Sequence, residues 1–155
     1  MIIVCDTRQQ AGKHNLKERY FAEQGIATVR SKLIVGDYAR LDNLTVAVDT
    51  KKDFVELAGN ICGGQHERFR AECELARKCG IRLVVLVEEV PPRGDLALWQ
   101  APKTKAGKPL TQVKGATLKK AMATMSERYG VEFMTTTKES AARAIIEILK
   151  EEVAR

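Results

Sequence analysis

The chain has 155 residues, of which 45% are hydrophobic and 30% are charged, and this composition excludes a disordered or fibrous protein. The length suits a single domain with a core of its own, so we expect one domain over residues 1–155. The 26 basic and 20 acidic residues leave a net charge of +6, which by itself excludes no class of partner.

The sequence also bears on the compartment. No apolar run reaches the length of a membrane span, and the first residues lack the basic start and apolar stretch of a signal peptide. The four cysteines contain no C-x-x-C pair and lie in segments with strand or helix character, as buried thiols of a reducing compartment do. We therefore expect an intracellular protein, in the cytoplasm or nucleoid, without a zinc site.

The start of the chain predicts a strand, a helix and a second strand. Residues 2–5 form a short apolar run, which predicts a buried strand with Asp6 at its carboxyl end. Residues 13–24 carry apolar side chains at helical spacing and are followed by Gly25, a favoured helix terminator. A strand over about 26–32 is expected to follow.

The middle of the chain continues with a hairpin, two helices and a strand. Runs of β-branched residues at 33–41 and 44–51 predict two strands joined by a turn. A short helix is expected from Phe54, and a longer one over 65–78. Residues 82–87 are apolar throughout, which predicts a central strand that is covered on both faces.

The last third of the chain begins with an irregular loop. Residues 91–115 contain several prolines and glycines and show no periodicity. A helix over 117–129, a strand over 131–134 and a helix over 139–153 follow. The alternation predicts an α/β domain with a central mixed sheet flanked by helices, in which the hairpin supplies the antiparallel part.

All of the net positive charge arises in one stretch. Between Asp95 and Glu127 there are six lysines, no arginine and no carboxylate, so the other 26 − 6 = 20 bases balance the 20 acids. Clustered positive charge is what phosphate binding needs, and we expect this segment to bind DNA; the alternative is a solvated loop. The six lysines are Lys103, Lys105, Lys108, Lys114, Lys119 and Lys120.

The residues that indicate chemistry are Asp37, which follows a glycine, and the triplet Asp49-Thr50-Lys51. Side chains two residues apart on a strand share a face, so Asp49 and Lys51 converge, and the hairpin brings Asp37 alongside. Two neighbouring carboxylates repel unless a divalent cation joins them, so we expect Mg²⁺, with Mn²⁺ as a substitute, at Asp37 and Asp49. Lys51 is then expected to assist a water that hydrolyses a phosphodiester. An isolated D-x-K is more often a strand end with a solvated lysine.

Several short motifs occur in order along the chain: D-T-R-Q at 6–9, G-D-Y at 36–38, V-D-T-K at 48–51 and R-F-R-A-E at 68–72. The series resembles the D-T-R-E, G-D-Y, V-E-R-K and R-[FL]-x-x-Q motifs of XPF-type structure-specific endonuclease domains, within the PD-(D/E)-x-K superfamily. The resemblance covers residues 1–90 well. It implies a restriction-endonuclease-like fold of three layers, in a compact form that is similar to proteins encoded in prophages.

The chain departs from the family pattern in three ways. Gln9 stands where the family has glutamate, and Asp49 and Thr50 replace the glutamate and arginine of E-R-K. The family also has an acid before the helix that follows this strand; here that acid is Asp53, which comes about two residues earlier than in the family. Asp53 and Glu56 together fit a capping box better than a catalytic role. The expected metal ligands Asp37 and Asp49 remain. Because Asp49 is shorter than glutamate and Thr50 replaces an arginine, the cleavage rate and the preferred metal stay open.

The resemblance implies further site residues. Asp6 is expected as a third carboxylate at the metal, with bonding to the local backbone as the alternative. Arg8 is expected to hold the scissile phosphate or orient the acids. Arg68 and Glu72, one helical turn apart, either support the site or form an ion pair on the helix surface. Independently of the resemblance, Trp99 in the irregular loop is expected either to dock that loop onto the core or to stack on a base.

These observations predict a Mg²⁺-dependent endonuclease that cuts branched or flap DNA in repair, recombination or replication. One alternative is a non-catalytic module of the same fold that binds DNA or a partner, although the intact Asp37, Asp49 and Lys51 argue against it. Another is a four-way-junction resolvase of a different PD-(D/E)-x-K branch. The resemblance also implies a homodimer or heterodimer. The helix-hairpin-helix modules of longer family members are not expected here, so DNA binding would depend on the basic loop or on a partner or second copy of the chain.

Overall fold

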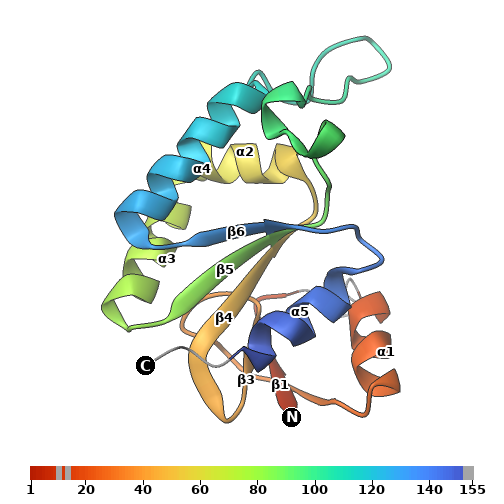
Figure 1. Cartoon of the computed structure of the whole chain (residues 1–155), viewed down its shortest axis with the longest axis vertical. Coiled ribbons are helices and arrows are strands. Elements are labelled where there is room, and N and C mark those ends of the chain that lie inside the picture. Colours follow the sequence, from red (N-terminus) through yellow and green to blue (C-terminus); the bar gives the residue numbers. More distant parts are fainter. Residues whose placement is uncertain (10–11, 13–14, 152–155) are drawn as a thin grey trace.

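A six-stranded mixed sheet forms the centre of the computed structural model, which describes residues 1–9, 12 and 15–151 (Figure 1). The strands are β1 (Ile2–Cys5), β2 (Ala27–Arg30), β3 (Tyr38–Arg40), β4 (Asn43–Lys51), β5 (Arg82–Val87) and β6 (Glu132–Thr135). They lie in the order β2-β1-β3-β4-β5-β6. β1 is parallel to β2, and β4, β5 and β6 are parallel to one another, whereas β3 is antiparallel to β1 and β4.

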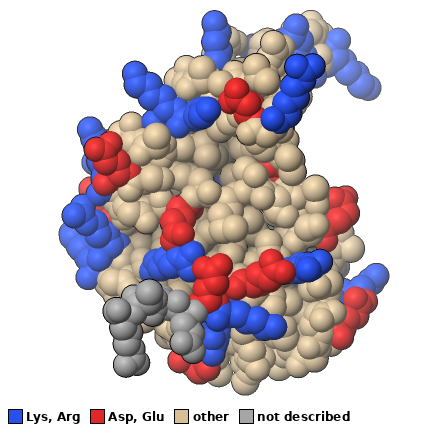
Figure 2. Space-filling view, in the orientation of Figure 1, with Lys and Arg blue, Asp and Glu red and all other residues tan. Residues whose placement is uncertain are grey.

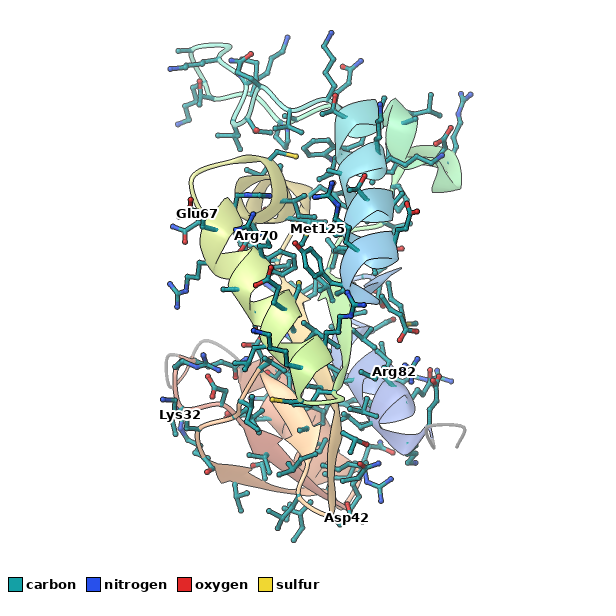
Figure 3. All side chains as sticks on the ribbon, turned by 90° about the vertical axis from the view of Figure 1, so that its left-hand side faces the viewer. Lys32, Asp42, Glu67, Arg70, Arg82 and Met125 are labelled. Carbon is teal, nitrogen blue, oxygen red and sulfur yellow. The ribbon has the colours of Figure 1, made fainter. Side chains whose placement is uncertain are left out.

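Helices cover both faces of this sheet. They are α1 (Asn15–Glu23), α2 (Phe54–Cys62), α3 (His66–Lys78), α4 (Gly115–Tyr129) and α5 (Ala141–Lys150). α2, α3 and α4 cover one face, and α1 and α5 cover the other (Figure 1). Figure 3 shows α3 and α4 side by side, with Met125 of α4 between them. This is the predicted α/β architecture, and no helix of the described chain is long and apolar enough to cross a bilayer.

The strands contribute side chains to an apolar cluster on each face, because successive residues point in opposite directions. Ala47 and Val85 belong to the cluster under α2, α3 and α4. Val48 and Leu86 belong to the cluster that contains Ile145 of α5. β5 is buried on both faces, as its uniformly apolar sequence predicts.

The hairpin is present but shorter than predicted. Gly36 has a φ of 77°, a left-handed conformation that a regular strand does not contain, so β3 begins only at Tyr38. β2 is also shorter than predicted and ends at Arg30. The predicted helix positions 13–14 and 152–153 lie outside the described residues.

The predicted irregular segment is held against the core at its start. It contains short 3-10 turns at Pro92–Gly94 and Leu96–Leu98. Trp99 is only 4% exposed, and its indole N–H donates to Glu89 Oε2 at 2.8 Å. The other oxygen of Glu89 accepts a hydrogen bond from the backbone N–H of Phe54 at 3.0 Å. Docking of the loop by Trp99 is therefore confirmed.

Candidate active site

A cleft of about 440 Å³ lies where the end of β4 meets α2 and α3. The residues predicted to act in the site all line it: Asp6, Arg8, Asp37, Asp49, Lys51, Arg68 and Glu72. The lining is completed by Gln9, Gly36, Glu56, Asn60, Gln65 and Phe69. The fold therefore brings together residues from the end of β1, the hairpin and two helices.

Asp49 and Lys51 lie on the same face of β4, as the strand alternation predicts. Asp49 Oδ2 and Lys51 Nζ are 3.1 Å apart, and only 7% and 10% of the two side chains are exposed. Burial would lower the pKa of Lys51, but the Asp49 carboxylate outweighs it and the net shift is upward. Lys51 Nζ also donates to Asn60 Oδ1 at 3.4 Å and lies 5.4 Å from the centre of the Phe69 ring. The ammonium group is thus charged and fixed in position.

Asp37 is positioned by a glycine turn and by Thr50. The left-handed φ of Gly36 turns the chain just before β3, and the Asp37 N–H donates to the carbonyl of Val48 at 2.8 Å. The backbone N–H and the hydroxyl of Thr50 both donate to Asp37 Oδ2, each at 2.8 Å. Oδ2 is therefore occupied, while Oδ1 has no recorded protein donor among the described residues.

The negative charge of Asp37 acts on the buried carboxylate of Asp49. Burial raises the pKa of Asp49 well above its usual value, the negative charge of Asp37 raises it further, and Lys51 opposes the shift. The buried Asp49 Oδ2 has the ion-pair contact with Lys51 but no hydrogen bond of good geometry. A cation bound here would offset both the desolvation of Asp49 and its repulsion by Asp37.

Asp6 accepts three hydrogen bonds from the protein. Its Oδ1 accepts from the N–H of Leu33 at 2.8 Å, and its Oδ2 accepts from Arg8 N at 3.1 Å and Arg8 Nε at 2.6 Å. Burial would raise the pKa of Asp6, but these hydrogen bonds outweigh it and lower the pKa. Within the described residues no three Asp, Glu, His or Cys side chains form a metal-binding group. The hydrogen bonds show that Asp6 orients Arg8, and its role as a third metal ligand stays a prediction.

Glu72 contacts the turn before Asp37 instead of forming the helix-surface ion pair. Its Oε1 accepts a hydrogen bond from the N–H of Gly36 at 2.8 Å, and in the described chain it makes no ion pair with Arg68. Arg68 is exposed and lines the cleft. Glu72 thus joins α3 to the loop that carries Asp37, and the guanidinium of Arg68 is available to a ligand.

The six lysines of the basic segment lie outside the cleft. All are exposed, and basic side chains gather at the end of the molecule formed by the 99–114 loop and the start of α4 (Figure 2). Lys119 forms an ion pair with Asp95 at 3.3 Å. The loop is folded back on itself through a bridge between Lys103 and Pro109, so it projects as a compact arm (Figure 1).

The sequence profile of the ERCC4 domain matches residues 5–149, which is nearly the whole chain. The chain belongs to the ERCC4 domain family. The prediction of an XPF-type nuclease domain is thereby confirmed. No curated protein matches the sequence.

This ERCC4 domain has the fold of a solved XPF. XPF from Aeropyrum pernix has a TM-score of 0.65 and 16% identity over 97% of this chain and 64% of that chain. XPF from Aeropyrum pernix in complex with DNA has a TM-score of 0.64 and 18% identity, over 96% of this chain and 62% of that chain. The predicted α/β fold is confirmed, and the chain spans slightly less than two thirds of these XPF chains.

Sequence reasoning missed two residues that support the cleft of the ERCC4 domain. Thr50 lies on the other face of β4, but its hydroxyl donates a hydrogen bond to Asp37. Asn60 lies one helical turn after Glu56, and this spacing could have placed both on one face of α2. Asp53 was correctly predicted as a helix cap, since its Oδ1 accepts from the Glu56 N–H at 2.8 Å.

Proposed function

We propose that this ERCC4 domain hydrolyses phosphodiester bonds of DNA in the cleft at the end of β4. The observation that carries the proposal is the convergence of Asp37, Asp49 and Lys51 at one cleft. The guanidinium groups of Arg8 and Arg68 line the same cleft, and their flat array of donors suits a phosphate. The cleft thus combines acidic oxygens for a metal with cations for the substrate.

A hard divalent cation fits the acidic side of this cleft. Asp37 Oδ1 and the carboxylate of Asp49 would hold it, because the first has no recorded protein donor and the second is buried beside a like charge. Mg²⁺ is commonly bound by one or two carboxylates and keeps several waters, so two ligands suffice; Mn²⁺ is the expected substitute. When bound, the ion would polarise a phosphoryl oxygen and lower the pKa of a water.

The protein's own groups then act on the phosphate and the water. Lys51, fixed by Asp49, Asn60 and Phe69, places a positive charge where negative charge develops on the phosphoryl oxygens. Arg8, held by Asp6, binds and orients the scissile phosphate. Arg68 supplies a second guanidinium from α3.

The proposed substrate is DNA with a branch or a flap, inside the cell, in repair, recombination or replication. One solved XPF of the same fold is described as a complex with DNA, and the exposed lysine arm supplies a separate basic surface on this chain. We further propose that the domain acts as a homodimer or with a related subunit. The substrate and the dimer are proposals for the whole protein, beyond its membership of the ERCC4 domain family.

Cleavage of labelled duplex, flap, fork and four-way DNA with Mg²⁺, Mn²⁺ or a chelator tests the proposal. Wild type should cut at least one branched substrate only with a metal, and Asp49→Asn should lose this activity because the metal loses a charged ligand. Asp42→Asn makes the same chemical change at an exposed turn far from the cleft and should remain active (Figure 3). DNA binding without cutting under every metal condition would contradict the proposal and favour the non-catalytic module.

A further inference from the structure

A second hollow, of about 750 Å³, adjoins the cleft at the carboxyl ends of β4, β5 and β6. Thr50 and Lys52 line it, whereas Asp49 and Lys51 line the cleft, so the two hollows lie on either side of the end of β4. Glu56 of α2 lines both and marks where they meet. We call this hollow the carboxyl-edge cavity; Lys17, Asp53, Val55, Glu88 and Lys138 complete its lining.

The acidic side chains of the carboxyl-edge cavity already have partners in the protein. Glu88 Oε1 lies 2.9 Å from Lys17 Nζ, and these side chains are only 8% and 11% exposed. Asp53 Oδ1 accepts from the N–H of Glu56 at 2.8 Å, and Glu56 Oε2 accepts from the N–H of Lys52 at 3.0 Å. Each carboxylate is therefore stabilised by donors or by a cation before any ligand arrives.

Lys52 and Lys138 give the carboxyl-edge cavity a positive charge. Both are exposed, and among the described residues neither forms an ion pair within 4.0 Å. Lys52 directly follows β4 and Lys138 follows β6, so they approach the cavity from two separate strands. The amino end of α2 adds its partial positive charge on the same side.

We propose that Lys52 and Lys138 bind a phosphate of the cleaved DNA strand, next to the scissile phosphate. This inference rests on the proposed function, because it assumes that the cleft holds the scissile bond. A strand that leaves the cleft past Glu56 enters the carboxyl-edge cavity, whose volume falls within the range of about 300–1,000 Å³ typical of ligand pockets.

Salt-dependent binding of a labelled forked DNA, measured by fluorescence anisotropy in chelator, tests this assignment. Each phosphate that the protein neutralises contributes about 0.7 to 0.9 to the slope of log K against log salt. The double variant Lys52→Gln/Lys138→Gln, which frees the one phosphate that the two lysines share, should therefore lower the slope by about 0.7 to 0.9. Lys78→Gln is the matched control, because Lys78 is an exposed lysine at the end of α3, near the amino edge of the sheet.

A DNA in which one phosphate is made neutral shows which phosphate the two lysines bind. A neutral methylphosphonate beside the scissile phosphate should weaken binding by wild type but cause no further loss in the double variant. An unchanged slope in the double variant, or an equal drop in Lys78→Gln, overturns the inference while wild-type cleavage leaves the proposed function standing. Wild type that neither binds nor cuts DNA overturns both.

Discussion

Replacing Thr50 by valine tests whether the hydroxyl of Thr50 prepares Asp37 for a metal. Valine keeps the branched shape of threonine and loses the hydroxyl that donates to Asp37 Oδ2 at 2.8 Å. The backbone N–H of residue 50 still donates to the same oxygen, so one of two donors is lost. Asp37 should remain in place, but its carboxylate should rotate more freely. Water can then hydrogen-bond to either of its two oxygens.

The size of the effect follows from the type of bond. A hydrogen bond to a charged group contributes about 1.5–3 kcal/mol, and removal of a partner that orients a metal ligand weakens metal binding about 10- to 100-fold. We therefore expect Mg²⁺ affinity to fall by about that factor in Thr50→Val. Thr50→Ser keeps the hydroxyl and should stay within a few-fold of wild type.

Titration calorimetry with Mg²⁺ measures the affinity directly, and cleavage rates over a range of Mg²⁺ concentrations give a second readout. The midpoint of the rate curve should move to higher Mg²⁺ in Thr50→Val, with a smaller change in the rate at saturation. Equal Mg²⁺ affinity in wild type and Thr50→Val would refute the reasoning. An equal loss in Thr50→Ser would instead show that the hydroxyl is not the group that matters.

Three further predictions concern stability and DNA binding. Glu88→Gln leaves Lys17 buried without its anion and should lower the free energy of unfolding by about 3 kcal/mol in denaturant titrations; a loss below about 1 kcal/mol contradicts this. The pKa of Asp6 is lowered in the folded state, so its stabilisation is complete above its unfolded pKa of about 3.9 and is lost as pH falls through the folded pKa. Asp6→Asn should be less stable than wild type at pH 7 and should lose less stability as the pH falls. Unfolding free energies of the two proteins that fall in parallel with pH would contradict this. Lys105→Glu with Lys108→Glu should flatten the salt dependence of DNA binding, whereas an unchanged slope would remove the loop from the DNA-binding surface.

The order of strands and helices could be predicted from the sequence, because apolar residues recur in each element at the spacing of a strand or a helix. The alternation along β4 correctly placed Asp49 and Lys51 on one face, and a continuous apolar run correctly marked β5 as central. The predicted hairpin was too long because Gly36 adopts a left-handed conformation, which composition alone does not reveal.

The details of the site were harder to predict because they depend on contacts between distant segments. Asp6 was expected at the metal, and the sequence did not show that its carboxylate also accepts from the N–H of Leu33, 27 positions further along the chain. Helical spacing left Glu72 either to support the site or to pair with Arg68, and in the folded chain it accepts from the N–H of Gly36 across a loop. Backbone donors of this kind leave no signature in side-chain patterns, so only the folded chain reveals them.

The carboxylate of Glu89 links the lysine arm to the helix beside the cleft. It joins the start of α2 to Trp99 at the base of the lysine arm, and the rings of Phe54 and Trp99 pack edge to face at 5.7 Å. These contacts hold the base of the lysine arm beside the start of α2, a helix that also lines the cleft. Under the proposed function, a DNA that contacts both the arm and the cleft spans the distance between them, and a branched or nicked duplex bends to do so at lower elastic cost than a straight one.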